Sequence, residues 1–192
     1  MDGDDERWLV ERARRDPAAC GDLYDRYFPR VYGYVRRRVD RTEDAEDLVA
    51  EVFLKAFAAL AGFEWRHQAS FAAWLFRIAR NLVVNFQQRQ PLGNIVPLDR
   101  IAARPTGAAS PEEETLRREQ AEVLHHQLRA LTPRRQEIIA LRFFGGLRNR
   151  EIAAVLDLDE RTVAAHLARG LADLHRAYLA ATPQPKAQAH HD

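Results

Sequence analysis

Apolar residues recur every three or four positions along most of the chain, the spacing of one face of an α-helix. No stretch shows the apolar-polar alternation with a period of two that marks a half-buried strand. A first helix is predicted near residues 5–16 and a longer one over 17–39. A third begins at Thr42, and a fourth runs through 71–88 behind Ser70 as its N-cap. The pattern therefore predicts an all-α fold.

The segment 91–110 interrupts this pattern, because it holds several prolines and glycines and no sustained periodicity. A capping box with proline at the first helical position then starts a helix at Ser110. Thr132 and Pro133 start another helix, which Gly145 and Gly146 end. We expect two small helical domains over 1–90 and 111–180, a flexible linker over 91–110 and a flexible tail over 181–192.

The stretch 148–178 is predicted to form a helix-turn-helix that ends in a basic helix. Its turn lies at 157–159, where Asp159 can cap the second helix. The predicted buried stripe of that second helix consists of Val163, Leu167, Leu171, Leu174 and Tyr178. Small and cationic side chains remain on the other face, which fits a DNA major groove. A plain helical hairpin with a solvated charged face is the alternative interpretation.

Charge is segregated along the 192 residues although the net charge is only +1. Acidic residues concentrate in 2–6, 42–51 and 112–114, and arginines in 36–38, 77–89, 134–150 and 161–176. This segregation suggests acidic surfaces for a protein partner and basic surfaces for phosphates.

Several classes of function are not expected. The single cysteine, Cys20, excludes an internal disulfide and a cysteine-built zinc site. The adjacent His125 and His126 cannot share one helix face, so no metal site is expected. No glycine-rich phosphate loop and no nucleophile beside a base can be recognised, and we expect no catalytic residues and no cofactor. An acidic N-terminus and the lack of a ~20-residue apolar run predict a cytoplasmic protein without membrane insertion.

Three blocks of sequence carry a resemblance to a known family. They are DAEDLVAEVFLKAF (44–57) and SFAAWLFRIARNLVVNF (70–86) in the first predicted domain, and LTPRRQEIIALRFFGGLRNREIAAVLDLDERTV (131–163) in the second. In this order they resemble the extracytoplasmic-function (ECF) sigma factors, the minimal specificity subunits of bacterial RNA polymerase. The resemblance implies a protein that binds core RNA polymerase, recognises the −35 and −10 promoter elements and promotes DNA melting. It also implies that the chain is not an enzyme, because the polymerase does the chemistry.

The resemblance assigns three sets of residues. The core-polymerase contacts are expected at Asp44, Glu46, Asp47, Leu48, Glu51 and Phe53. The contacts to the melted −10 strand are expected at Trp65, Arg66, His67, Gln68, Arg77, Arg80, Asn81, Asn85 and Arg89. The contacts to the duplex −35 element are expected at Arg148, Arg150, Glu151, Arg161, Thr162, Ala165, His166 and Arg169.

Alternatives stay open for individual residues of these sets. The acidic residues could form a solvated face with ordinary salt bridges. Trp65 is the candidate base-stacking aromatic, because it lies in a loop, whereas Phe71 and Trp74 at helical spacing are expected in the core. Glu151 is either a base or amide contact or a charge that stabilises its helix.

The recognition helix departs from the family pattern, since Ala164 and His166 stand where family members commonly carry lysine and arginine. Each lost phosphate contact lowers the salt-dependence slope by about 0.9, so weak duplex binding is expected.

Two other functions compete with this interpretation: a stand-alone helix-turn-helix regulator, and a helical adaptor that binds only proteins. An anti-sigma protein between the two domains is a further partner that the resemblance implies. If the domains pack together in the free chain, the DNA-facing surfaces should be partly covered.

Overall fold

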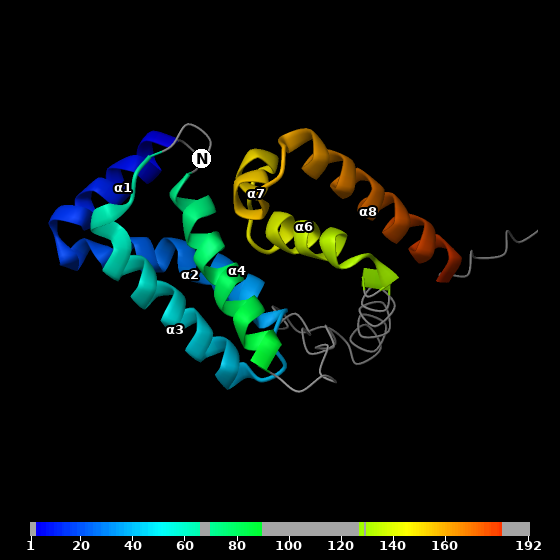
Figure 1. Cartoon of the computed structure of the whole chain (residues 1–192), viewed down its shortest axis with the longest axis horizontal. Helices are drawn as coiled ribbons and strands as arrows, with labels where there is room; N and C mark the ends of the chain where they lie inside the picture. Colours follow the sequence, from blue (N-terminus) through cyan, green and yellow to red (C-terminus); the bar gives the residue numbers. More distant parts are fainter. Residues whose placement is uncertain (1–2, 66–69, 90–126, 129, 182–192) are drawn as a thin grey trace, which may run out of the picture.

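The computed structural model describes residues 3–65, 70–89, 127–128 and 130–181, and every regular element in these ranges is a helix (Figure 1). The elements of domain 1 are α1 (Gly3–Arg15), η1 (Pro17–Ala19), α2 (Cys20–Arg36), α3 (Thr42–Ala59), η2 (Leu60–Gly62) and α4 (Phe71–Arg89). Those of domain 2 are α6 (Pro133–Phe143), α7 (Asn149–Leu156) and α8 (Glu160–Ala181). The all-α prediction is confirmed.

Several predictions lie outside the described residues. They are the linker over 91–110, almost all of the helix expected from Ser110 to about 131, the domain boundaries at 90 and 111, and nearly all of the tail.

Domain 1 is a bundle in which α2 packs on α3 and α3 packs on α4. The residues that line its interior include Leu23, Val31, Val52 and Leu75, all fully buried at helical spacing on their elements. Helix α4 starts where the sequence predicts, because the Ser70 hydroxyl accepts a hydrogen bond from the Ala73 backbone N–H at 3.2 Å.

Domain 2 contains the predicted helix-turn-helix, formed by α7 and α8. Asp157 takes the left-handed conformation at the turn, with φ 55°. The carboxylate of Asp159 accepts a hydrogen bond from the Thr162 backbone N–H at 2.7 Å, so the predicted cap is confirmed. The predicted buried stripe of α8 is wrong at its far end: Val163 is fully buried, but Leu171 and Tyr178 are 39% and 40% exposed.

The two domains lie against each other rather than apart (Figure 1). Helix α7 packs alongside α4, and buried side chains of both domains belong to one continuous apolar cluster. Phe76 of domain 1 and Leu141 of domain 2 are both fully buried members of it. Parts of the surfaces predicted to face DNA are therefore covered by the neighbouring domain.

Candidate protein and nucleic-acid interfaces

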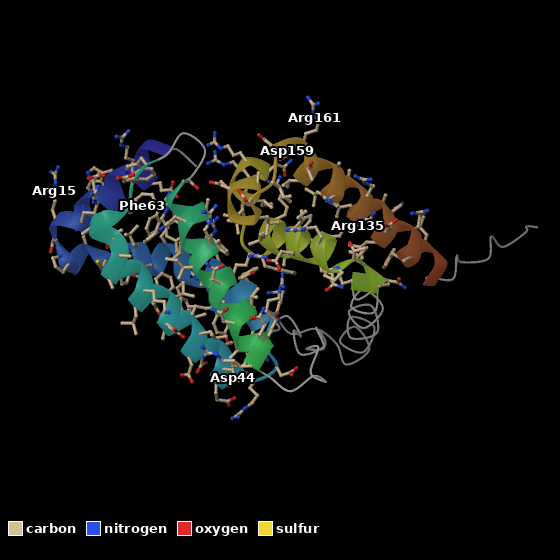
Figure 2. All side chains as sticks on the ribbon, viewed as in Figure 1. Arg15, Asp44, Phe63, Arg135, Asp159 and Arg161 are labelled. Atoms are coloured by element: carbon tan, nitrogen blue, oxygen red, sulfur yellow. The ribbon has the colours of Figure 1, made fainter. Side chains whose placement is uncertain are left out.

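The outer side of α3 carries acidic residues around one exposed leucine. Glu46, Asp47 and Glu51 are exposed, and Leu54, seven positions after Asp47 and so about two turns along the same face, is 71% exposed. We call Glu46, Asp47, Glu51 and Leu54 the acidic ridge. Lys55 pairs with Glu51 at 3.2 Å, which leaves the ridge anionic overall. Asp44 is half-buried in the first turn of α3, where Figure 2 labels it.

Two of the predicted polymerase contacts need correction. Leu48 is 6% exposed and Phe53 is 3% exposed, so both side chains face the interior of domain 1. Phe53 packs against the ring of Tyr24 with 4.7 Å between ring centroids. These residues hold α3 in place and cannot reach a partner in this structure. The sequence prediction missed Leu54, whose position three after Glu51 places it on the acidic face.

The predicted −10 residues of α4 divide into two groups. Asn81, Asn85 and Arg89 are exposed. Arg77 is also exposed, but it donates a hydrogen bond to the backbone carbonyl of Ala154 in α7. Arg80 is half-buried, and its Nε atom lacks a hydrogen-bond partner. Domain 2 therefore engages Arg77 and leaves the C-terminal half of the predicted surface open.

Trp65 is anchored to domain 1. Its ring packs edge-on against Phe63 at 5.0 Å between centroids, its Nε1 donates to Glu11 Oε1 at 3.2 Å, and the Arg7 guanidinium lies over it. The residue as a whole is half-buried. The neighbouring predicted contacts Arg66, His67 and Gln68 lie outside the described residues.

The predicted −35 residues gather at the start of α7 and along α8. Arg148, Arg150, Arg161 and Arg169 are exposed, and Figure 2 shows Arg161 pointing outward at the start of α8. The other predicted contacts on α8 are partly exposed: Thr162, Ala165 and His166. The Thr162 hydroxyl donates to Asp159 Oδ2 at 2.6 Å and so belongs to the cap.

In this structure Glu151 acts as a helix-stabilising charge, which is one of the two roles left open by the sequence. Its side chain is buried and accepts hydrogen bonds from the Arg148 backbone N–H at 2.8 Å and from the Arg148 guanidinium at 3.0 Å. The Ser70 hydroxyl donates to its Oε1 at 2.7 Å from the other domain. Burial alone raises the pKa of this carboxyl, but the hydrogen bonds from Arg148 and Ser70 outweigh it, and the pKa is lowered.

A row of residues on α2 and in the turn after it forms the rest of the contact between the domains. Arg30, Tyr34 and Arg38 lie one helical turn apart, and we call them the covered ridge. Arg30 Nε donates to Gly145 O at 2.8 Å, and the Tyr34 hydroxyl donates to Glu137 Oε1 at 2.8 Å. Arg38 forms an ion pair with the same Glu137 carboxylate. The sequence prediction did not include these residues.

The described ranges hold neither a metal-binding cluster nor a membrane-spanning helix. No group of three or more His, Cys, Asp or Glu side chains gathers there in a way that could hold a metal ion. No helix among these residues has both the length and the apolarity to cross a bilayer.

Two family models match the chain. The model described as "Sigma-70 region 2" matches residues 23–91, and the model described as "Sigma-70, region 4" matches residues 121–174. The two matches coincide with the parts of the chain that carry the acidic ridge and the helix-turn-helix.

Curated relatives carry related names. The ECF RNA polymerase sigma factor BldN of Streptomyces coelicolor is 35% identical over 162 residues, which are 81% of this chain and 59% of BldN. The chain thus spans less than two thirds of that relative. The ECF RNA polymerase sigma-E factor of Escherichia coli is 33% identical over 170 residues, covering 84% of this chain and 87% of that protein. The RNA polymerase sigma factor YlaC of Bacillus subtilis is 30% identical, with 77% and 86% covered.

Solved structures share the fold. CnrH in complex with the cytosolic domain of CnrY has a TM-score of 0.67 at 24% identity, covering 94% of this chain and 100% of that chain. The sigma factor RpoE in complex with the anti-sigma factor NepR from Bartonella quintana has a TM-score of 0.62 at 18% identity, covering 84% and 98%. At these identities the likeness supports the fold alone.

Proposed function

Because the chain belongs to the sigma-70 family and is a sigma factor of the extracytoplasmic-function type, we propose that it binds bacterial core RNA polymerase, recognises −35 and −10 promoter elements and helps to open the DNA. The observation that carries this proposal is the exposed acidic ridge on α3, in the same chain as a helix-turn-helix. A stand-alone regulator is not favoured, since it needs no region 2 and no acidic docking helix.

The acidic ridge is the proposed docking surface for the polymerase. Charges at the rim of an interface act mainly on the rate of encounter and on register, so Glu46, Asp47 and Glu51 would orient the complex. A central apolar side chain contributes more to affinity once it is desolvated. The Leu54 side chain is 71% exposed and therefore adds little to the core of domain 1. It is the proposed apolar anchor among these carboxylates.

Helix α4 is the proposed surface for the melted −10 strand. The amides of Asn81 and Asn85 can hydrogen-bond base edges, and Arg77, Arg80 and Arg89 can hold phosphates. Stacking on an aromatic ring contributes about 1–3 kcal/mol per base, which is the role proposed for Trp65. Arg66, His67 and Gln68 remain predicted contacts of the same strand.

Helix α8 is the proposed recognition helix for the −35 duplex. Arg161 and Arg169 can reach phosphates, while the partly exposed Ala165 and His166 lie between them and can face base edges. Arg148 and Arg150 at the start of α7 would add backbone contacts. With Ala164 and His166 in place of cations, duplex affinity is expected to be weak and to depend less steeply on salt.

An anti-sigma protein is a further proposed partner. Two solved structures that share this fold, CnrH with the cytosolic domain of CnrY and RpoE with the anti-sigma factor NepR, are complexes with a second chain. We also propose that the protein acts in the bacterial cytoplasm, where RNA polymerase works, and contributes no catalytic residue of its own.

Transcription in vitro with purified core polymerase, followed by sequencing of the 5′ ends, tests this function. We expect promoter-specific transcripts that require the chain. Asp47→Lys should reduce initiation and polymerase binding, because it reverses a charge in the acidic ridge. Asp25→Lys makes the same charge change at an exposed position of α2 and serves as the matched control. Absence of both polymerase binding and specific transcripts with the unsubstituted chain would refute the proposal.

A further inference from the structure

Helix α1 contacts the segment that carries Trp65, although α1 lies before the part of the chain that the region 2 model matches. Arg7, Glu11 and Arg14 are three or four positions apart and share one face of α1. Arg14 donates to Ala61 O at 2.9 Å, and Glu11 Oε1 accepts from Trp65 Nε1 at 3.2 Å. The Arg7 guanidinium carbon lies 5.9 Å from the centroid of the Trp65 ring. This face of α1 therefore follows the segment from Ala61 to Trp65.

The same helix contacts the start of α4. Glu6 Oε1 accepts a hydrogen bond from the Ala72 backbone N–H at 3.2 Å. This N–H belongs to the first turn of α4, where backbone donors lack a partner within the helix. The Tyr27 hydroxyl donates to the same Glu6 oxygen and so fixes the carboxylate from α2. Helix α1 thus connects the segment that carries Trp65 to the helix that carries Asn81 and Asn85.

The bond between Trp65 and Glu11 sets the orientation of the indole. An indole has one polar atom, which is a donor only, so its single hydrogen bond restricts rotation of the ring. Phe63 restricts the ring further through an edge contact. The hydrogen bond from Trp65 is the main cause of a lowered pKa of Glu11, so this carboxylate is charged at neutral pH. A negative charge repels phosphates, and Glu11 is therefore suited to orient the ring rather than to bind a nucleic-acid strand.

Arg7 offers the ring a different kind of neighbour, because its side chain is exposed and cationic. Proteins bind single strands with aromatic rings that stack on bases and with cations that follow the backbone. Arg7 and Trp65 place one group of each kind side by side. The flexible Arg7 side chain can therefore reach the phosphate of a nucleotide that stacks on Trp65.

A second pair of arginine and tryptophan on α1 provides a comparison. The Arg12 guanidinium carbon lies 5.2 Å from the centroid of the Trp8 ring, but Arg12 also forms an ion pair with Asp22 at 2.9 Å. Trp8 is 57% exposed. This pair repeats the contact of Arg7 with Trp65 away from the proposed strand, so it supplies matched controls.

We propose that α1 positions the aromatic ring for the melted −10 strand: Glu11 orients the Trp65 indole, and Arg7 binds the phosphate of the nucleotide that stacks on it. Glu11 is a positioning residue that acts through Trp65, whereas Arg7 contacts the strand. The inference rests on the proposed function, which assigns Trp65 to the −10 strand. An indole that is not oriented beforehand must be ordered during binding, which should weaken strand binding by about 2- to 12-fold.

Fluorine NMR of the free, full-length chain labelled with 5-fluorotryptophan tests the orientation without polymerase or DNA. The chain has three tryptophans, Trp8, Trp65 and Trp74, and replacement of each by phenylalanine assigns its resonance. Glu11→Ala should shift the Trp65 resonance and increase its solvent isotope effect. Glu11→Gln keeps an acceptor oxygen and should restore most of the original resonance. Helix content by circular dichroism should be equal in all variants.

Binding of the holoenzyme to a single-stranded oligonucleotide tests the strand contact. The oligonucleotide carries the non-template −10 sequence of a promoter identified by 5′-end sequencing. Trp65→Ala should weaken binding by at least about fivefold. Glu11→Ala should weaken it by about 2- to 12-fold, and by much less in the Trp65→Ala background, because Glu11 acts through the ring. An abasic site at the stacked position should remove the effect of Glu11→Ala, which a general structural defect would not do.

The salt dependence of the same binding reports the role of Arg7. Arg7→Ala should reduce the slope of log affinity against log salt by about 0.7, the value for one phosphate contact on a single strand. Arg12→Ala removes the same kind of group from beside Trp8 and should leave the slope and the Trp65 resonance unchanged. Affinity for core polymerase should be equal in all these variants.

An unmoved Trp65 resonance in Glu11→Ala, or a Glu11→Ala defect that persists in the Trp65→Ala background, would overturn the positioning role. An unchanged salt slope in Arg7→Ala would overturn the phosphate contact. Normal strand binding by Trp65→Ala would remove the ring, and with it this inference, from the −10 surface while polymerase binding stands. Absence of polymerase binding and of transcripts with the unsubstituted chain would instead refute the proposed function, and the NMR spectra would still decide whether α1 orients the indole.

Discussion

Domain 1 presents two charged rows at helical spacing, and the structure treats them in opposite ways. The acidic ridge of α3 points to solvent around an exposed Leu54, whereas the covered ridge of α2 donates its hydrogen bonds to domain 2. Both rows would look alike in a helical projection of the sequence. The difference shows that a charged row can bind an external partner only where no other part of the same chain already binds it.

The largest expected effect separates the two faces of α3. Leu48→Ala removes a side chain that is 6% exposed and should lower the free energy of unfolding by about 2–5 kcal/mol. Leu54→Ala should change it by less than about 0.5 kcal/mol, since its side chain is exposed. Urea unfolding measures both values.

The same pair should behave differently with polymerase. At temperatures where both variants are folded, Leu54→Ala should weaken binding to core polymerase by more than about 1 kcal/mol, the range of an interface anchor. Leu48→Ala should bind normally once corrected for its folded fraction. An unaltered affinity of Leu54→Ala would remove this residue from the proposed docking surface.

The second prediction concerns a substitution that disrupts the contact between domain 2 and α2. Gly145→Ala places a Cβ atom within 2.9 Å of the Phe76 ring and should lower the free energy of unfolding by about 1–3 kcal/mol, because buried backbone and a packed ring must move. Gly21→Ala in α2 has nothing within 4 Å of the added atom and should stabilise the chain by up to about 1 kcal/mol. Equal effects of the two substitutions in urea unfolding would contradict the fit described for Gly145.

A third prediction uses pH to loosen the α7 side of the contact. The pKa of Glu151 is lower in the folded chain than its ordinary value of 4.5, so the folded chain binds its proton less readily than the unfolded chain does. The stabilisation that the ionised Glu151 carboxylate gives the folded chain is complete above the unfolded-state pKa of about 4.5. It is lost as the pH falls through the lower pKa of the folded chain. At pH 7, Glu151→Gln should cost about 1–2 kcal/mol, the range of a charged hydrogen bond.

Urea unfolding between pH 7 and pH 3 measures this contribution. The difference between the unsubstituted chain and Glu151→Gln should shrink as the pH falls. A difference that stays constant over that range would show that the carboxylate charge does not contribute.

The smallest expected effect comes from a substitution that stabilises domain 2 at a position away from its contact with domain 1. Asp157 holds φ 55°, a conformation that costs non-glycine residues energy, so Asp157→Gly should stabilise the chain by about 0.5–1 kcal/mol. Asp157→Val should destabilise it, because a branched side chain tolerates this conformation poorly. Thermal unfolding measures both effects.

The sequence was sufficient for most of the described helices, because their starts depend on local signals, although the helix predicted over 17–39 already ends at Arg36. Ser70 and Asp159 cap the helices they were predicted to cap, and Thr132 with Pro133 starts α6. The orientation of α3 was predicted less well, since the motif was assigned as a block and the buried Leu48 and Phe53 were included with the acidic contacts.

The contact between the domains could not be predicted from local patterns. Tyr34 and Glu137 are 103 positions apart, and nothing in the spacing of either residue indicates the other. Glu151 is a related case, because its cap on α7 is local but its bond to Ser70 spans 81 positions. Within α8, the apolar spacing of Leu171 and Tyr178 indicated a buried face, but it could not indicate how much of the helix the neighbouring elements cover.

Arg30 binds domain 2 through main-chain oxygens of Gly145 and Gly146, and this has a consequence for how the two halves can diverge. Peptide carbonyls do not titrate, and a side-chain exchange on domain 2 can displace these two oxygens but cannot delete them. The hydrogen bonds at this point are therefore insensitive to pH, and their donor can be removed only from domain 1, by replacing Arg30.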